Sequence, residues 1–397
     1  MNTSTTNDTG FSPERLARIR LAMQRYVDDG KLAGIITAIA RRDQVVHLEC
    51  VGNADIAADR PMRPDTLVRI YSMTKPITSV AVLMLLEEAR LRLDDPISRY
   101  IPAFADTQVL ADAKGNDGAL VPPTRPIQIR DLLTHTAGLS YGFDPNDYLD
   151  GLYRKQLWEQ QESLFEKGFE AVINAVAALP LAFQPGTAFR YSFATDVLGF
   201  LVQVVSGMPF DAFLKQRIFE PLGMTDTDFF VPAEKIERFA ANYGPGDGGS
   251  LNVIDAPDTG RFSRPVSFPS GGGGLVSTTN DYLKFAQMLL NKGTGNGNRL
   301  LGRKIVEWMA INHLPEGVHP FGDRARGFGL GVSYMLDPGQ SATPESVGNF
   351  GWGGAANTNF WVDPEEGFTA VFMAQFMPAN TYPAVDDFRT LVYQALA

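Results

Sequence analysis

The chain has 397 residues and a mass of 43.4 kDa, a length that fits two or three domains, or one large α/β domain with an insertion. Its 44% hydrophobic content excludes a disordered or fibrous protein, and a net charge of −10 without a block of Lys or Arg excludes nucleic acid as an expected partner. Because Cys50 is the one cysteine and the four histidines show no HExxH spacing, we expect no internal disulfide, no cofactor and no metal.

The N-terminal segment carries neither a basic region nor an apolar core of the kind found in secretory signals. The longest apolar run, Val80–Leu86, is far too short to cross a bilayer. We therefore expect a cytoplasmic protein that does not interact with membranes.

The first elements are marked by capping and turn residues. Ser12 is a helix N-cap followed by proline, and the helix that it starts is expected to end near Gly30. Two β-type runs follow, Gly34–Arg41 and Gln44–Gly52, and Arg42-Asp43 joins them as a hairpin.

Sequence patterns typical of helices dominate the middle of the chain. A long helix is expected from near Ser72 to about Leu93, and the stretch from Asp94 to about Phe230 is mostly helical. Further helices are expected at Ile127–Thr134, Leu164–Leu179, Thr195–Val205, Phe210–Phe219, Asn280–Leu290, Arg303–Ile311 and Ala384–Leu396. Strands return beyond Phe230, at Phe328–Met335, Thr358–Val362 and Thr369–Gln375.

Strands near both ends, with helices between them, indicate an α+β fold whose sheet takes strands from both termini. We expect an α/β domain made of residues 1–93 and 231–397, and a mostly helical domain at residues 94–230.

Ser72 and Lys75 form an S-x-x-K motif at the expected helix start. Three residues make almost one helical turn, so the hydroxyl and the ammonium lie on one face within hydrogen-bonding reach. A lysine there can activate the serine as a nucleophile, and the helix N-terminus favours the developing negative charge. A capping serine followed by an ordinary lysine would give the same pattern.

Ser140 offers a competing nucleophile, because Gly138-Leu139-Ser140-Tyr141-Gly142 matches the G-x-S-x-G motif. That motif needs a buried strand before it and a helix after it. Here a helix is expected before the serine and turn residues follow it, so the context disfavours this reading.

Two further segments matter to a serine–lysine site. Tyr191, between a turn and a helix, could supply the general base that such a site lacks. Gly351-Trp352-Gly353-Gly354-Ala355 could expose backbone N–H groups for an oxyanion hole, although a tight turn would look the same. We interpret the other glycine run, Gly271–Gly274, as structural, and His135 as a core residue.

Together these segments resemble the family VIII serine carboxylesterases, which are related to class C β-lactamases and penicillin-binding proteins. The resemblance runs from about residue 15 to the C-terminus. The stretches that carry it are Tyr71–Pro76, Leu132–Leu139, Tyr191, Pro221–Met224, Gly272–Thr278 and Trp352–Gly354.

The resemblance implies an antiparallel sheet flanked by helices, a helical domain and a cleft between them. It implies that Ser72 is acylated, with Lys75 as its partner and Tyr191 as the base. The backbone N–H groups of Ser72 and Ala355 would form the oxyanion hole.

Two departures from the β-lactamase pattern concern substrate binding. Phe193 replaces the asparagine of Tyr-x-Asn, and Trp352-Gly353-Gly354 replaces Lys-Thr-Gly. An amide donor and a carboxylate-binding lysine are thus missing, which favours neutral esters over peptides and β-lactams.

We therefore expect a carboxylesterase acting on short-chain acyl esters, with weak β-lactam hydrolysis possible. A β-lactamase or D-amino-acid peptidase, an acyltransferase, and a catalytically inactive binding protein are the alternatives. A small-molecule ester is the expected partner, and the sequence leaves the oligomeric state open.

Overall fold

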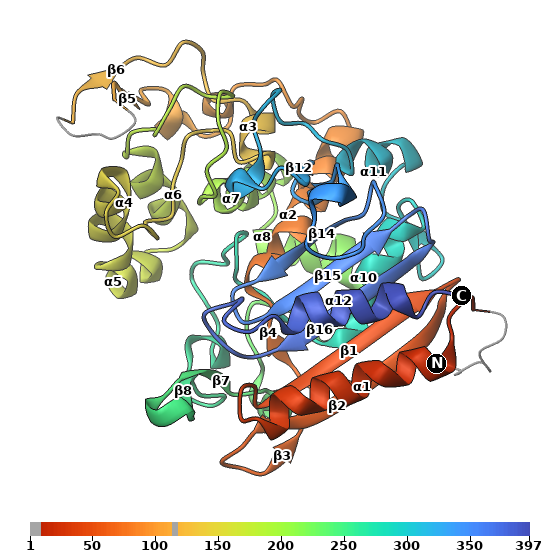
Figure 1. Ribbon diagram of the computed structural model, residues 1–397. Coiled ribbons are helices and arrows are strands. Elements are labelled where there is room, and N and C mark those ends of the chain that lie inside the picture. Colours follow the sequence, from red (N-terminus) through yellow and green to blue (C-terminus); the bar gives the residue numbers. More distant parts are fainter. Residues whose placement is uncertain (1–8, 113–117) are drawn as a thin grey trace.

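A large antiparallel sheet forms the centre of the computed structural model, which describes residues 9–112 and 118–397 (Figure 1). Its eight strands lie in the order β12-β13-β14-β15-β16-β1-β2-β3. These strands are β1 (Gly34–Arg41), β2 (Gln44–Asp55), β3 (Arg60–Pro61), β12 (Arg326–Phe328), β13 (Ser333–Met335), β14 (Phe350–Gly354), β15 (Thr358–Asp363) and β16 (Phe368–Ala374). Since β16 pairs with β1, the sheet joins the two ends of the chain.

Helices cover both faces of this sheet, which confirms the predicted fold class (Figure 1). Helices α1 and α12 pack on one face, and α10 packs on the other. The helices are α1 (Pro13–Asp28), α2 (Thr74–Glu87), α3 (Ile129–Leu133), α4 (Tyr148–Tyr153), α5 (Gln161–Glu166), α6 (Phe169–Ala177), α7 (Ala194–Ser206), α8 (Phe210–Leu214), α9 (Glu220–Leu222), α10 (Thr279–Leu290), α11 (Arg303–Met309) and α12 (Ala384–Gln394).

Strand β1 shows why the sheet needs helices on both sides. Its alternate side chains enter two different cores: Ile35 and Ile39 contact the α1/α12 layer, whereas Ile36 and Ala38 face the α2/α10 layer. All four are completely buried. Apart from Thr37 and the terminal Arg41, the strand is therefore apolar on both faces rather than alternating.

The shorter strand pairs lie outside the main sheet. They are β4 (Val68–Arg69) with β9 (Val276–Ser277), β5 (Val109–Leu110) with β6 (Leu120–Val121), β7 (Asn242–Pro245) with β8 (Leu251–Asp255), and β10 (Thr294–Gly295) with β11 (Asn298–Arg299). Helices α3 to α9 lie between residues 94 and 230, together with the β5–β6 pair. The division into two domains at residues 93/94 and 230/231 stays a prediction.

The local signals at the start of the chain are confirmed. The Ser12 hydroxyl accepts a hydrogen bond from the Arg15 N–H, and α1 begins at Pro13. Arg42 and Asp43 both adopt positive φ, 53° and 59°, as a two-residue hairpin turn requires.

Three predicted elements were too long. The helix expected up to Leu93 ends at Glu87, because the chain turns at Ala89, which has a φ of 56°. The helix expected at Leu164–Leu179 is broken into α5 and α6 at Gly168, which has a φ of 96°. The single strand expected at Phe328–Met335 is a hairpin of β12 and β13, since the chain reverses around Gly331.

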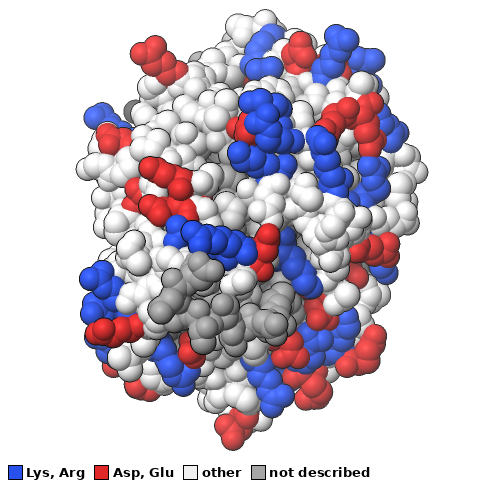
Figure 2. Space-filling model, turned by 90° about the vertical axis from the view of Figure 1, so that its right-hand side faces the viewer, with Lys and Arg blue, Asp and Glu red and all other residues white. Residues whose placement is uncertain are grey.

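No single helix in the described ranges combines the length and the apolar character that a bilayer span requires. The segments Ala194–Ser206 and Phe210–Leu222 meet those criteria only as a pair, bent by 82°. The face shown in Figure 2 carries both basic and acidic side chains, scattered among uncharged ones. The cytoplasmic location stays a prediction.

Acid is expected to destabilise the protein partly through His47. Its ring is 8% exposed and lies 2.8 Å from the Thr37 hydroxyl, and burial lowers its pKa from 6.5 to about 4. Between these two values the unfolded chain binds a proton that the native protein does not. Stability conferred by the neutral ring is therefore lost as the pH falls below about 6.5, by about 1.4 kcal/mol per pH unit. Urea unfolding of the wild type and His47→Gln at pH 7.5 and 5 measures this, and an equal loss in both proteins would contradict it.

Candidate active site

Ser72 and Lys75 lie at the start of α2, as the motif predicts. Ser72 sits in a 3₁₀ turn, Tyr71–Met73, and Lys75 lies in the first turn of α2. Ser72 is half-buried and lines a cavity, whereas Lys75 is 1% exposed. The nucleophile candidate thus faces solvent while its lysine is enclosed by protein.

Three oxygen atoms surround the Lys75 ammonium. Its Nζ donates to the Gly272 carbonyl at 2.5 Å and to the Tyr141 hydroxyl at 2.9 Å, and it lies 3.4 Å from Ser72 Oγ. The first two contacts fix the ammonium, and the third leaves it within reach of the serine. A buried amine held in this way can exchange a proton with the hydroxyl.

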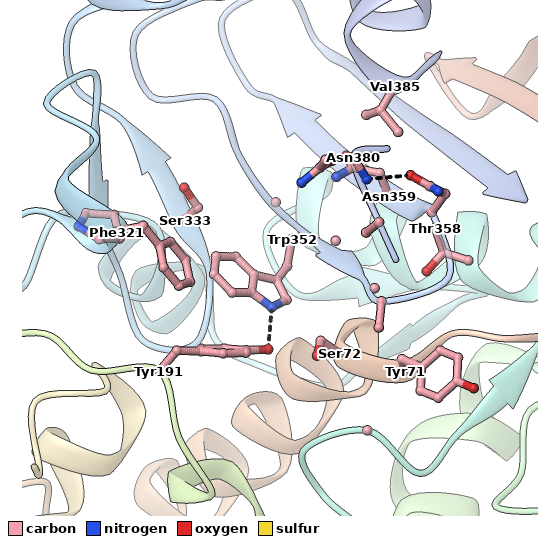
Figure 3. Close-up of a pocket in the computed structure, with 18 of the residues that line it drawn as sticks. Tyr71, Ser72, Tyr191, Phe321, Ser333, Trp352, Thr358, Asn359, Asn380 and Val385 are labelled. Atoms are coloured by element: carbon pink, nitrogen blue, oxygen red, sulfur yellow. Dashed lines mark hydrogen bonds between the residues drawn. The ribbon is translucent and has the colours of Figure 1, made fainter. Parts of the chain in front are cut away.

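Tyr191 lies against the same lysine, but through its ring. Lys75 Nζ is 4.5 Å from the centre of the Tyr191 ring, and the Tyr191 hydroxyl accepts a hydrogen bond from Trp352 Nε1 at 3.3 Å (Figure 3). No hydrogen bond joins the Tyr191 hydroxyl to Ser72 or Lys75 within residues 9–112 and 118–397. The structure therefore brings Tyr191, Trp352 and the serine–lysine pair together.

Tyr141 is a site residue that the sequence did not single out. It lies inside the G-x-S-x-G match around Ser140, in which the motif concerns the serine alone. The Tyr141 hydroxyl, 2.9 Å from Lys75 Nζ, also lies 3.4 Å from an Asp196 carboxylate oxygen. Burial, together with Asp196 and Tyr191, raises the pKa of Tyr141 well above 10. This second tyrosine is a neutral hydrogen-bonding partner of the lysine.

Asp196 closes the network behind the lysine. It accepts hydrogen bonds from the Ser270 hydroxyl at 2.5 Å and from the Gly272 N–H at 3.1 Å. Burial raises the pKa of Asp196 above its ordinary value, although the nearby Lys75 favours the ionised form. Asp196 thereby holds the segment whose carbonyl binds Lys75.

The glycine run at 271–274 belongs to the site, so our purely structural interpretation of it was wrong. A Cβ on Gly272 would lie 2.4 Å from the Asp196 carboxylate and 2.6 Å from the Tyr141 hydroxyl. A Cβ on Gly271 would lie 2.7 Å from the Thr195 carbonyl oxygen. Glycine allows this segment to approach both residues closely enough for its carbonyl to reach Lys75.

The end of β14 packs directly on the turn that carries Ser72. A Cβ on Gly354 would lie 2.3 Å from the Ile70 carbonyl oxygen, which also accepts a hydrogen bond from the Thr358 hydroxyl. Ser72 and Ala355 both line the cavity as a result. This arrangement is compatible with an oxyanion hole formed by their two backbone N–H groups, as the resemblance implies.

The cavity beside Ser72 has a volume of about 940 Å³, near the upper end of the range of roughly 300–1,000 Å³ typical of ligand sites. Trp352, Gly353, Gly354 and Phe193, which we predicted to bind substrate, all line it. One part of the wall is aromatic and consists of Tyr141, Phe143, Trp158, Phe165, Phe193 and Phe268. Figure 3 shows Tyr191 and Trp352 on one side of Ser72 and Tyr71 on the other.

Ser140 and His135 have other roles. The Ser140 hydroxyl contacts the Asp150 carboxylate and accepts a hydrogen bond from Arg190 Nε at 2.8 Å, and no strand–turn–helix elbow surrounds it. His135 is buried against the Tyr191 ring, with centroids 4.8 Å apart. Burial, and secondarily Lys75, lowers the pKa of His135 well below 6.5. This histidine supports the Tyr191 ring in its neutral form.

Known proteins are similar to this chain, in sequence or in structure, over nearly its whole length. Protein Rv1367c of Mycobacterium tuberculosis (strain ATCC 25618 / H37Rv) is 37% identical over 368 residues, covering 90% of this chain and 89% of its own. Esterase EstB of Burkholderia gladioli is 30% identical over 398 residues and covers 94% of each chain. The solved structure of EstCE1, a hydrolase with promiscuous acyltransferase activity, superposes with a TM-score of 0.83 at 27% identity, covering 96% of this chain and 99% of that one.

These matches confirm the resemblance to esterases related to β-lactamases and penicillin-binding proteins. The sequence model of the family described as beta-lactamase matches residues 19–395. The chain therefore belongs to the beta-lactamase family and has the fold of its serine hydrolases.

Proposed function

We propose that the protein is a serine carboxylesterase that cleaves short-chain acyl esters through an acyl-enzyme on Ser72. The observation that carries this proposal is the position of Lys75. Its buried ammonium lies 3.4 Å from Ser72 Oγ and is fixed by the Gly272 carbonyl and the Tyr141 hydroxyl. A cavity-facing serine beside a fixed, buried amine is the arrangement that nucleophilic catalysis without histidine requires.

In the proposed mechanism, Ser72 Oγ bonds to the ester carbonyl carbon while Lys75 takes its proton and gives one of its own to Tyr191. Tyr191 accepts that proton as the phenolate, and its oxygen moves onto Lys75 Nζ for the transfer, since the two are not hydrogen-bonded in the resting structure. The backbone N–H groups of Ser72 and Ala355 stabilise the oxyanion. Collapse of the tetrahedral intermediate breaks the bond to the alcohol oxygen, which takes the proton. Water then attacks the acylated Ser72, gives up a proton by the same route, and releases the acid as Ser72 regains its hydrogen.

The lining of the cavity favours esters over β-lactams. Trp352 contacts Tyr191 where a carboxylate-binding lysine would stand in a β-lactamase, and Phe193 is buried among aromatic rings. Neither residue offers the charge or the amide that a β-lactam would need. Weak β-lactam hydrolysis remains compatible with the nucleophile.

Acyl transfer is a second candidate, because the similar structure of EstCE1 is described as having promiscuous acyltransferase activity. The same acyl-enzyme would serve, with an alcohol in place of water. The aromatic wall gives such an alcohol an apolar surface on which to bind. Product analysis with added methanol separates transfer from hydrolysis.

Labelling with a fluorophosphonate, followed by peptide mapping, tests the proposal. We expect a single adduct on Ser72, which is lost in Ser72→Ala, because the serine next to the lysine is the activated one. Turnover of 4-nitrophenyl butyrate is expected to exceed that of a chromogenic cephalosporin in kcat/KM.

Three results would contradict it. An adduct on Ser140 would indicate an elbow-type hydrolase, and a larger kcat/KM on the cephalosporin would indicate a β-lactamase. Neither adduct nor ester turnover would indicate a binding protein.

A further inference from the structure

Three arginines line the cavity beside Ser72, and they differ in how their charge is compensated. Arg326 and Arg389 both donate to one carboxylate oxygen of Glu345, at 2.5 and 3.1 Å. Arg261 makes no hydrogen bond or ion pair with any residue in the described ranges 9–112 and 118–397. The cavity wall thus contains a guanidinium whose N–H groups have no acceptor among the described residues.

Two aromatic rings connect Arg261 to the turn that carries Ser72. Its guanidinium carbon lies 4.7 Å from the centre of the Phe262 ring, and that ring packs edge-on against Tyr71 at 5.8 Å. Tyr71 immediately precedes Ser72. Figure 3 shows Tyr71 on the side of Ser72 opposite Tyr191 and Trp352. Arg261 therefore belongs to the side of the cavity away from the proposed proton relay.

Arg69, a second arginine near the Phe262 ring, has a carboxylate partner that compensates its charge. Arg69 lies 5.7 Å from the centre of the Phe262 ring, and it is completely buried and bonded to the Asp255 carboxylate at 2.7 Å. The Arg261 side chain is instead exposed where it lines the cavity. Desolvation by the surrounding protein lowers the pKa of Arg261, and Tyr71, Asp255 and Asp196, none of which bonds to it, partly offset this by raising the pKa. An anion entering the cavity would supply the missing counter-charge.

The two sides of Ser72 would receive different halves of an ester. If Tyr191 gives its proton to the leaving alcohol, then the alcohol half lies beside Tyr191 and Trp352. The acyl half must then extend in the other direction, past Tyr71. A chain extending that way would approach the wall that Arg261 lines.

We propose that Arg261 binds a carboxylate in the acyl half of the substrate, so that the preferred substrates are monoesters of dicarboxylic acids. This inference rests on the proposed esterase function and narrows its substrate class. A guanidinium offers a carboxylate two parallel N–H donors, which gives both affinity and orientation. Trp352 leaves the alcohol side neutral, so the substrate carries its charge at one end only.

The test compares two esters of equal chain length, 4-nitrophenyl hydrogen adipate and 4-nitrophenyl hexanoate, with non-enzymatic hydrolysis subtracted. We expect the wild type to have the larger kcat/KM for the anionic ester. Arg261→Gln should lower the anionic-to-neutral ratio by about 10- to 100-fold, the size of one charged hydrogen-bonded contact. Arg261→Lys should recover part of the ratio because it restores the charge. Arg264→Gln, on the same loop but outside the lining of the cavity, should leave the ratio unchanged.

If the variants fail to fold, a measurement on the wild type alone still tests the inference. Raising the salt concentration to 0.5 M should lower the ratio several-fold, because an exposed charge is screened. A ratio unaffected by both Arg261→Gln and salt would overturn the inference, while continued turnover of the hexanoate would leave the proposed function standing. The inference also fails if Arg261→Gln selectively slows 4-carboxyphenyl butyrate relative to phenyl butyrate, since the anion would then be bound in the alcohol half. If the wild type turned over none of these esters, the proposed function itself would be wrong.

Discussion

Replacing Lys75 with methionine is expected to lower kcat/KM for 4-nitrophenyl butyrate by about 1,000-fold or more. The lysine lies within reach of Ser72 Oγ and is fixed on two other sides by the Tyr141 hydroxyl and the Gly272 carbonyl. General acid–base assistance of this kind contributes roughly 100- to 10,000-fold, and activation of the nucleophile adds to it. Methionine has a similar length and suits a side chain that is 1% exposed. Steady-state kinetics, with thermal unfolding measured alongside, gives the result.

Some stability should also be lost in Lys75→Met. The Gly272 carbonyl and the Tyr141 hydroxyl lose a shared hydrogen-bond donor inside the protein, and an unsatisfied buried group costs about 1–3 kcal/mol. Lys284→Met is the matched control, because Lys284 also donates to a carbonyl, that of Gly223, but lies outside the lining of the cavity. We expect the control to keep its activity. Full activity in Lys75→Met would rule out the lysine as the partner of Ser72.

Tyr191→Phe is expected to reduce kcat by about 100- to 10,000-fold, the usual range for loss of a general acid or base. The change removes one oxygen atom and leaves the ring that packs on Lys75 and His135. Because the hydroxyl is proposed to protonate the leaving alcohol, the loss should fall on kcat rather than on KM. Single-turnover rates with esters of increasingly poor leaving groups measure it, and the defect should grow with the basicity of the alcohol.

Tyr141→Phe decides which of the two tyrosines has that role. Tyr141 is the one whose hydroxyl bonds to Lys75 Nζ, and its raised pKa suits a neutral donor or acceptor that positions the amine. We expect a smaller loss than in Tyr191→Phe and no dependence on the leaving group. The reverse pattern, with Tyr191→Phe near normal and Tyr141→Phe severely impaired, would transfer the base to Tyr141. Tyr243→Phe, which removes a hydroxyl far along the chain from both, serves as the control for loss of a hydrogen bond.

Local patterns in the sequence were enough to predict parts of the fold and of the site. The S-x-x-K spacing depends only on one helical turn, so Ser72 and Lys75 could be paired without the tertiary structure. The segment containing Trp352 and the glycines was recognised by composition, and it forms β14 next to the Ser72 turn. Element ends were less predictable, because the chain turns at Ala89 and Gly331 through tertiary contacts and local backbone angles.

The remaining site residues could not be found locally. Tyr141 lies in a segment without regular structure, and its contact with Lys75 spans 66 positions in the chain. The Gly272 carbonyl is 197 positions away from the lysine, and a backbone oxygen leaves no trace in the sequence. The one local signal was the run of four glycines at 271–274. Glycine costs conformational entropy on folding, so such a run indicates a segment that other residues approach closely, as Tyr141 does here.

Helix α2 is buried from Thr74 to Leu85, and the proposed nucleophile Ser72, which lines the cavity, lies two residues before its first residue. Segments with this much enclosed surface open only when a protein unfolds as a whole. The proposed nucleophile is consequently attached to a segment whose amide hydrogens should exchange slowly, while most of the aromatic wall and the glycine run at 271–274 come from loops. Adaptation to new esters can therefore proceed by changing those loops, without disturbing the segment that places the nucleophile.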